Sequence, residues 1–148
     1  MSSSEEKNKA LARRFLEATA RADLDAMDEM MAPDFVDRSL MPGQEPEREG
    51  FKRSVAEMDA PVSHQRVTIE DQIPEGDKVL TRATFRGVHD QGEFLGMVPT
   101  GEEWTFKAMY VHRIAGGKIV EEWTEGDIGP FQERLDEEMR ERERVEQK

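Results

Sequence analysis

The stretch "WTFKAMYVHRIAGGKIVEEWTEGD", residues 104–127, decides how the second half of the chain folds. Two runs of alternating side chains flank a Gly-Gly pair at 116–117. Glycine adopts positive φ without steric cost, so this pattern predicts a β-hairpin with a two-residue turn. In the first strand, Trp104, Tyr110 and His112 share a parity with other apolar residues, and we expect this set to face the interior.

The second strand carries four acids within seven positions, and its register decides which acid enters the interior. A regular two-residue hairpin pairs His112 with Glu121. It also pairs Tyr110 with Trp123, so Glu121 and Trp123 would both point inward. A bulge or a three-residue turn would shift the register by one residue and put Glu122 inside instead. We favour the regular register because it alone keeps Trp123 on the apolar face.

The composition limits the domain organisation and the possible partners. A chain of 148 residues, 36% of them hydrophobic and 36% charged, has the size of one domain with a single core. We assign residues 1–135 to that domain and 136–148 to a charged helical tail. The net charge of -12 argues against nucleic acid or an anionic membrane as a partner. Because neither a membrane-spanning stretch nor the apolar run of a signal peptide is present, we expect a cytoplasmic protein.

The side-chain inventory restricts the chemistry. The chain has no cysteine, which excludes disulfides, thiolate catalysis and cysteine-ligated metals. Its three histidines are scattered and form no pair with metal-ligand spacing. We therefore expect no metal and no cofactor. Any catalysis must come from carboxylates, histidine, tyrosine, arginine, lysine or hydroxyl groups.

The order of the predicted elements indicates the fold class. Helical periodicity predicts two helices within residues 2–31, with Asp23 as the cap between them, and a third helix ending near Asp59. The first of them opens with serines three residues before glutamates, which is the spacing of a capping box. From there the period changes to two, and three or four strands follow, with Phe85 and His89 on the inner face of one of them. Helices followed by a long, curved antiparallel sheet predict an α+β cone in which the helices close one side of a pocket.

Several motifs carry a family resemblance. In chain order they are "PGQEPEREGFK", "GVHDQGEFLGMVPTG" and "VHRIAGGKIVEEWTEGD". Over about residues 8–135 the chain resembles the SnoaL-like polyketide cyclases (ester cyclases) of the nuclear-transport-factor-2-like superfamily. The resemblance implies a cone-shaped α+β barrel and a cofactor-free aldol ring closure of a polyketide ester. It also implies a general acid/base aspartate near the end of the last strand, which Asp127 matches, and a histidine on the preceding strand, which His112 matches.

The chemistry that the resemblance implies is consistent with these residue types. A carboxylate in an apolar cone has its pKa raised, which makes it a better base toward an acidic carbon. His112 would donate a hydrogen bond to the enolate oxygen as charge develops there. Arg38, at the mouth, would hold a carboxylate or keto oxygen of a small apolar or aromatic substrate. The other expected substrate-binding residues are Phe85, His89, Trp104, Tyr110, Glu121 and Trp123.

Two other functions stay open, since one fold hosts many activities. In the first, the protein only binds a small apolar ligand, and Glu121 neutralises His112 in a closed pair without chemistry. In the second, the same cone serves an isomerase or a hydrolase. We also expect a homodimer that pairs through the outer face of the sheet, where Met109, Val111 and Val120 would be exposed.

Overall fold

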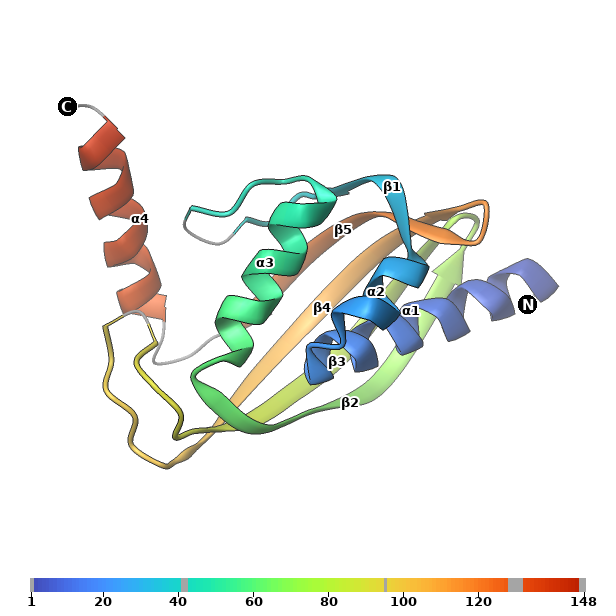
Figure 1. The fold of residues 1–148 in the computed structure, drawn as a ribbon. Helices are drawn as coiled ribbons and strands as arrows, with labels where there is room; N and C mark the ends of the chain where they lie inside the picture. Colours follow the sequence, from blue (N-terminus) through green and yellow to red (C-terminus); the bar gives the residue numbers. More distant parts are fainter. Residues whose placement is uncertain (1, 41–42, 95, 128–131, 147–148) are drawn as a thin grey trace.

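The computed structural model describes residues 2–40, 43–94, 96–127 and 132–146 (Figure 1). Helices precede the main strands, as the periodicity predicts. The elements are α1 (Ser3–Arg21), α2 (Leu24–Met30), β1 (Met31–Asp37), α3 (Arg48–Asp59), β2 (Val62–Glu75), β3 (Lys78–His89), β4 (Glu103–Ala115), β5 (Lys118–Asp127) and α4 (Gln132–Glu146).

Local sequence signals fix the ends of the first two helices. Ser2 and Glu5 form a capping box at the start of α1, in which each side chain bonds the other residue's backbone N–H. Asp23 caps α2 by accepting a hydrogen bond from the backbone N–H of Ala26 at 3.1 Å, which confirms the predicted cap. The helix ends at Met30, since Pro33 disfavours helical geometry in the residue before it.

The strands form one five-stranded sheet in the order β1-β5-β4-β3-β2. The four strands from β2 to β5 pair in antiparallel fashion with their neighbours, which confirms the predicted α+β class. The sheet is curved but does not close into a complete barrel (Figure 1). β1 joins at the edge beside β5 and runs parallel to it. The sequence gives no local signal for this parallel pairing, because its two strands lie more than eighty residues apart.

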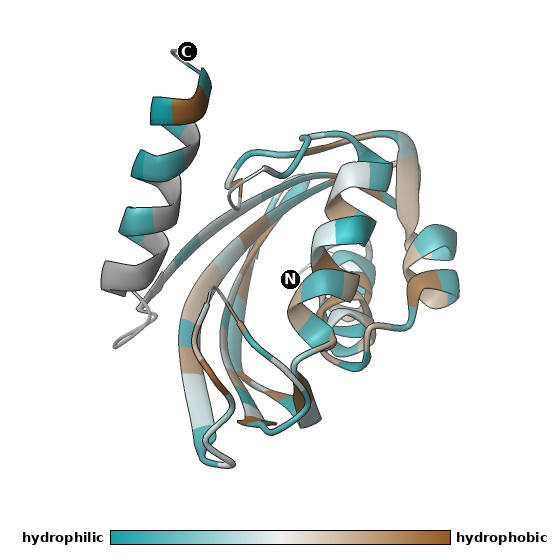
Figure 2. Cartoon of the chain, turned by 60° about the vertical axis from the view of Figure 1, so that its left-hand side comes forward, coloured by the Kyte–Doolittle hydropathy of each residue, from teal (hydrophilic) through white to brown (hydrophobic). Residues whose placement is uncertain are grey.

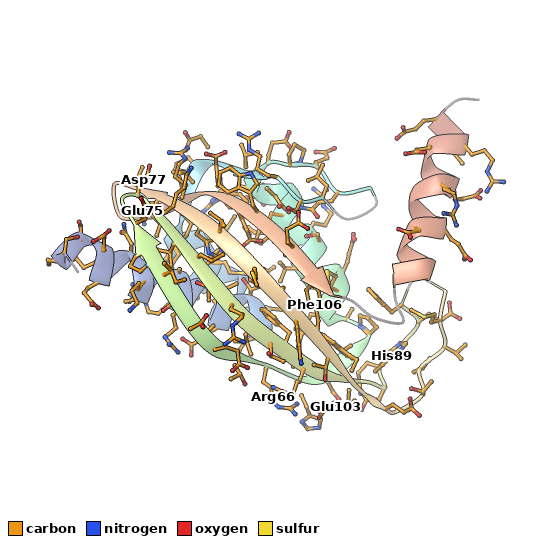
Figure 3. The ribbon with its side chains drawn as sticks, turned by 180° about the vertical axis from the view of Figure 1, so that it is seen from behind. Arg66, Glu75, Asp77, His89, Glu103 and Phe106 are labelled. Atoms are coloured by element: carbon orange, nitrogen blue, oxygen red, sulfur yellow. The ribbon has the colours of Figure 1, made fainter. Side chains whose placement is uncertain are left out.

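The core lies between α1, α3 and the inner face of the sheet (Figure 1). Its centre is an aromatic cluster in which Phe51 stacks on Phe15, with 5.9 Å between ring centroids, and lies 5.1 Å from Phe35. Along the strands, hydrophobic and hydrophilic residues alternate (Figure 2). The outer face carries charge, including the ion pair of Arg66 and Glu103 at 2.8 Å (Figure 3). The predicted inner face of β4 is confirmed, with Tyr110 and His112 buried.

The turn of the β4–β5 hairpin is as predicted, but the register beyond it is not. Gly116 and Gly117 have φ values of 58° and 75°, and Ile114 pairs with Ile119. A bulge follows, because the next pair joins Arg113 to Glu121. Val120 is therefore an extra residue with no partner of its own. Its side chain is buried at 8% exposure, so the expectation of an exposed Val120 was wrong.

The bulge changes which acid points inward. His112 pairs with Glu122 and not with Glu121, and Trp123 pairs with Val111 on the outer face. The favoured inward orientation of Glu121 and Trp123 was wrong, and the alternative with Glu122 inside is correct. Polar partners explain the outcome, since Glu122 meets His112 in the interior. On the outer face, the ring of Trp123 lies 5.8 Å beneath the ammonium group of Lys78, a cation–π contact.

The C-terminal helix α4 extends from the end of β5 away from the sheet (Figure 1). The side chains of Phe131, Leu135 and Met139, apolar residues at helical spacing in this part of the sequence, lie outside the described residues. Among the described helices, none combines the length and apolar character needed to cross a bilayer.

Candidate active site

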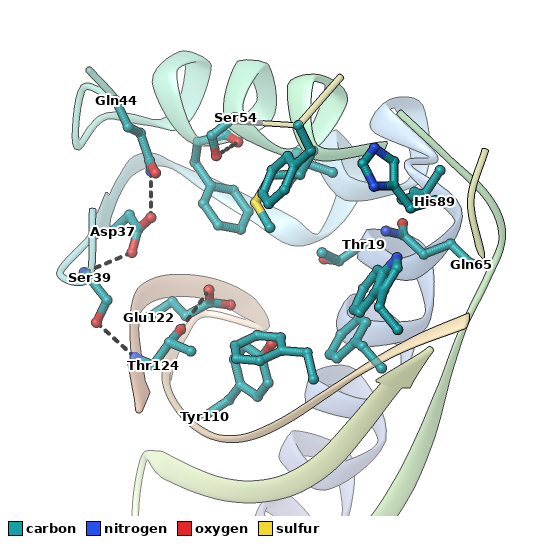
Figure 4. Close-up of a pocket in the computed structure, with 18 residues that line it drawn as sticks. Thr19, Asp37, Ser39, Gln44, Ser54, Gln65, His89, Tyr110, Glu122 and Thr124 are labelled. Carbon is teal, nitrogen blue, oxygen red and sulfur yellow. Dashed lines mark hydrogen bonds between the residues drawn. The ribbon is translucent and has the colours of Figure 1, made fainter. Parts of the chain in front are cut away.

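A cavity of about 200 Å³ opens between α1, α3 and the inner face of the sheet (Figure 4). One water molecule needs only roughly 10–15 Å³, so this space is large enough for an organic ligand. Its middle is aromatic, which favours an apolar or aromatic ligand. The aromatic residues lining it are Phe51, Phe85, Phe94, Trp104, Phe106 and Tyr110.

Two carboxylates lie side by side at one end of the cavity. Asp37 is the last residue of β1, and it pairs with Glu122 of β5 in the parallel register. Both side chains are buried, with 4% of each residue exposed, and both line the cavity. The backbone fixes their positions, because the N–H of Arg38 donates to the carbonyl of Glu122 at 2.9 Å and that of Asp37 donates to Pro46 at 2.8 Å. This end of the cavity is called the acidic pole below.

Burial raises the pKa of Asp37 to about 6, and the neighbouring negative charge of Glu122 adds to the rise. Two hydrogen bonds and, more weakly, the charge of His112 oppose the shift without cancelling it. The backbone N–H of Ser39 donates to one carboxylate oxygen at 3.0 Å, and the Gln44 amide donates to the other at 2.5 Å (Figure 4). Asp37 therefore changes its protonation state close to neutral pH.

Glu122 is held from behind by a histidine. The His112 Nε2 lies 2.6 Å from one oxygen of Glu122, and the hydroxyl of Thr124 lies 3.4 Å from the other. Because an ionised carboxylate can only accept, Nε2 is the donor. The Nδ1 of His112 is buried and has no hydrogen-bond partner among the described residues.

Tyr110 lies between the acidic pole and the aromatic middle. Its ring is parallel to that of His112, with 6.1 Å between centroids. Burial, followed by the charges of Glu122 and Asp37, raises the pKa of the Tyr110 hydroxyl well above its usual value. The hydroxyl therefore stays protonated and can donate a hydrogen bond to an oxygen of a bound ligand.

At the opposite end, three polar residues face the same cavity: Thr19 of α1, Gln65 of β2 and His89 at the end of β3 (Figure 4). This end is called the neutral pole below. The His89 Nε2 lies 2.6 Å from the carbonyl oxygen of Gly92, which fixes the ring. The cavity thus has polar groups at both ends and an aromatic middle.

This combination of fold and cavity is matched by a known family. The family model for SnoaL-like polyketide cyclases matches residues 9–133. The chain belongs to this family. No curated protein sequence matches it. Among solved structures, the SnoaL-like chain is similar to IdmH, a proposed polyketide cyclase from Streptomyces antibioticus, with 28% identity over 89% of this chain and 97% of IdmH and a TM-score of 0.72.

Two further solved structures show that different activities are attributed to proteins with this fold. AclR, a proposed hydroxylase from Streptomyces galilaeus, shares 26% identity over 90% of this chain and 98% of its own, with a TM-score of 0.76. An LEH-like epoxide hydrolase from M. tuberculosis shares 17% identity over 92% of this chain and 94% of its own, with a TM-score of 0.66, and therefore supports the fold alone. Within such a range, the reaction must be argued from the residues of the site.

In this SnoaL-like protein, four of the expected substrate-binding residues line the cavity: Phe85, His89, Trp104 and Tyr110. His112, expected as a catalytic residue, is fully buried behind Glu122 and is not among the described lining residues. Asp127 is the last residue of β5, where its backbone pairs with Lys107. The side chain of Asp127 lies outside the described residues, so its catalytic role stays a prediction.

The remaining expected residues lie on the other side of β5. Glu121 binds Arg38 at 2.8 Å and Arg113 at 2.5 Å, away from the cavity. Hydrogen bonds from Arg113 and then from Arg38 lower the pKa of Glu121. Arg38 is therefore committed to a protein carboxylate. Trp123 is also not among the described residues that line the cavity.

Sequence reasoning missed Asp37 as a site residue. A usable signal exists, since Phe35 and Asp37 share a parity in the short strand and Phe35 is a core residue. Gln44, Gln65 and Thr19 were also missed. Their positions depend on how α1, β2 and the loop after β1 meet in space, and no local pattern encodes that.

Proposed function

We propose that the protein is a cytoplasmic, cofactor-free cyclase that closes a ring in a small polyketide-like ester by an intramolecular aldol reaction. The observation that carries this proposal is the pair of buried carboxylates, Asp37 and Glu122, at one end of an aromatic cavity. A carboxylate whose pKa lies close to neutral pH is suited to take a proton and to return it.

The first step is removal of a proton from a carbon that lies between two carbonyl groups of the substrate. Asp37 is the base, because its pKa of about 6 leaves it mostly ionised at pH 7 while keeping it basic. The electron pair of the broken C–H bond forms an enolate. The protonated hydroxyl of Tyr110 donates to the enolate oxygen, which stabilises the developing charge.

The second step forms the ring. The enolate carbon attacks a second carbonyl carbon of the same molecule, a C–C bond forms, and the electrons of that C=O bond move to its oxygen. This oxygen takes the proton held by Asp37. The product is an isomer of the substrate, so the reaction needs no oxidant, reductant or cofactor. The aromatic walls hold the chain folded so that the two reacting carbons meet.

Glu122 and His112 have supporting roles in this scheme. The negative charge of Glu122 contributes to the raised pKa of Asp37. His112 donates to Glu122 at 2.6 Å and so fixes the side chain that faces the base. His112 is a positioning residue here, rather than the direct acid that the family resemblance implies. Asp127 stays a second candidate for the acid/base and is included in the test for that reason.

The test uses aromatic methyl esters that carry a 1,3-diketone side chain and, within reach of it, a separate ketone that serves as the aldol acceptor. Binding is measured as ligand-induced thermal stabilisation, and ring closure is followed by loss of the diketone absorbance and by mass spectrometry. We expect wild type to bind and convert such esters, and Asp37→Asn to bind but not convert them. Glu121→Gln is the matched control and should keep its activity.

Other outcomes separate the alternatives. Full activity in Asp37→Asn together with none in Asp127→Asn would move the acid/base role to Asp127. Esters that bind to every variant and are converted by none would make the protein a binding protein.

We also propose that the protein forms a homodimer through the outer face of the sheet. An apolar row supports this, since Ile73, Leu80, Val111 and Trp123 occupy successive cross-strand positions on β2 to β5. Ile73 is 61% exposed, and Met109 beside the row is 50% exposed. Sedimentation should give a dimer at micromolar concentration and a shift toward monomer in Met109→Glu. A monomeric wild type would contradict the proposal.

A further inference from the structure

The neutral pole of the cavity has an unusual hydrogen-bonding balance. Its polar side chains are those of Thr19, Gln65 and His89, and none of them carries a formal charge when the imidazole is neutral. In each of the three, the polar hydrogens are already bound to protein acceptors. What each side chain offers to a ligand is therefore an acceptor atom.

His89 is fixed by its surroundings in one tautomer. Its Nε2 lies 2.6 Å from the carbonyl oxygen of Gly92, and a carbonyl can only accept, so Nε2 carries the proton. In the neutral ring, Nδ1 is then an acceptor. The backbone is fixed as well, because the N–H of His89 donates to Glu102 at 3.1 Å and its carbonyl accepts from Gly101 at 2.9 Å. The ring lies over the cavity on a rigid strand end (Figure 4).

Gln65 and Thr19 have the same balance. We assign the Gln65 amide in the orientation in which its nitrogen donates to the carbonyl of Ala20 at 2.8 Å and to Asp59 at 3.3 Å. Both amide hydrogens are then used, and the amide oxygen is what Gln65 can offer to a ligand. The hydroxyl of Thr19 donates to the carbonyl of Phe15 at 2.9 Å, which leaves its oxygen as an acceptor.

We propose that the neutral pole binds a hydroxyl group of the substrate, on the part of the molecule farthest from the carbons that react at Asp37. The atoms that His89, Gln65 and Thr19 offer to a ligand can only accept a hydrogen bond. They therefore require a ligand group that donates one. This assignment rests on the proposed function for the orientation of the substrate: the carbonyl groups lie at the acidic pole and the hydroxyl at the neutral pole.

The chemistry of the pole favours a hydroxyl over an ammonium group. An ammonium ion would have to leave water for an aromatic cavity, and the three described side chains of this pole supply no negative charge to compensate it. A carbonyl or an ether can only accept, and the donor it meets is the Trp104 indole N–H, which lines the cavity and has no partner among the described residues. A hydroxyl can accept from that N–H and also donate to the three acceptors. The pole therefore selects for a phenol or an alcohol.

The test measures binding alone, so that it does not depend on turnover. The probes are 6-hydroxy-2-acetonaphthone and 6-methoxy-2-acetonaphthone, two-ring ketones that differ only in whether the far oxygen can donate. Dissociation constants are measured by calorimetry at pH 8, where an imidazole is neutral. For wild type we expect the hydroxy compound to bind roughly 5- to 10-fold more tightly, the effect of one buried hydrogen bond.

Variants at the two poles locate the preference. Gln65→Met and Thr19→Val keep the side-chain size and remove an acceptor, and we expect either change to reduce the preference to within about 2-fold. His89→Phe also removes an acceptor and should reduce the preference in the same way, and it serves as a third variant for the case in which one of these fails to fold. Glu122→Gln and Asp37→Asn should leave the preference unchanged, because they lie at the other end of the cavity.

The possible outcomes separate this inference from the proposed function. Equal binding of the two probes by wild type, or failure to bind the hydroxy compound, would overturn the inference. A preference lost in Glu122→Gln but kept in Gln65→Met would also overturn it, since the hydroxyl would then lie at the acidic pole. Loss of ring closure in Asp37→Asn bears only on the proposed function and does not alter these constants.

Discussion

Glu121 and Glu122 are neighbours of the same type on β5, yet the fold gives them opposite environments. Glu121 points outward, where Arg38 and Arg113 both bind it and lower its pKa. Glu122 points inward, where its partners are the ring of His112 and the hydroxyl of Thr124, and no arginine of the described residues reaches it. Burial raises the pKa of Asp37 beside it, and the negative charge of Glu122 adds to that rise.

The difference shows that one extra residue, Val120, decides which glutamate belongs to the site. On the outer face, Glu121 forms ion pairs with two arginines. On the inner face, Glu122 lies beside a second acid, Asp37. The same residue type is thus an ion-pair partner at 121 and a candidate catalytic group at 122. The variants below test that contrast, beginning with the largest expected effect.

The first prediction compares Glu122→Gln with Glu121→Gln. The substitution at 122 removes the negative charge that helps to raise the pKa of Asp37, which makes Asp37 a weaker base, and we expect ring closure to fall by about 10²-fold, the lower end of the range for general acid/base catalysis. The substitution at 121 should change the rate by less than about 3-fold. Initial rates with the diketone esters give both values. Equal losses in the two variants would mean that the faces do not differ in function.

The second prediction concerns the partner of Glu122. His112→Phe keeps an aromatic ring but removes the only described nitrogen bonded to the carboxylate. We expect a 10- to 100-fold lower kcat and a loss of stability of about 1–3 kcal/mol, because a buried carboxylate oxygen loses its donor. His112→Gln can still donate and should restore part of kcat. Unchanged kcat in His112→Phe would show that the histidine is a core residue only.

The third prediction is a pH dependence of stability. The pKa of Asp37 in the folded protein, about 6, is above its ordinary value of 3.8, so the folded state binds more protons between these values. Wild type therefore loses stability as the pH rises from about 4 to 6, by at most about 3 kcal/mol. Asp37→Asn lacks this loss. Thermal unfolding at several pH values measures this effect. The Tm of Asp37→Asn minus the Tm of wild type should increase as the pH rises to about 6 and should then stay constant.

The fourth prediction has the smallest expected effect. Arg38→Ala removes one of the two arginines that hold Glu121, while Arg113 stays. Arg38 is half-exposed, and exposed ion pairs contribute about 0–1 kcal/mol, so we expect a decrease in stability below about 1 kcal/mol. Ring-closure rates should stay within about 3-fold of wild type. A large loss of substrate binding would instead support the sequence-based role of Arg38 at the mouth.

Much of the fold follows from local patterns in the sequence. The capping box at Ser2, the cap at Asp23, the Gly116-Gly117 turn and the inner faces of β3 and β4 all depend on short-range physics, and the structure confirms them. The bulge at Val120 does not follow from a local pattern, because it depends on partners that the chain brings together only on folding.

The candidate site was predictable only in part for the same reason. Aromatic residues on strands, such as Phe85 and Tyr110, could be assigned by parity, and they do line the cavity. Asp37 comes from a strand that pairs in parallel with β5 across a long separation in sequence, so its approach to Glu122 is a tertiary event. The resemblance to the SnoaL-like family led to the fold, but it pointed to Asp127 and not to this pair.

Asp37 and Glu122 share one buried site, and a carboxyl NMR titration of Asp37 tests this without a substrate. We expect a midpoint near pH 6 in wild type. In Glu122→Gln the midpoint should fall but stay above the ordinary aspartate value, since burial persists, and in Glu121→Gln it should not move. An ordinary midpoint in wild type, or one that responds to residue 121 and not to residue 122, would contradict the account.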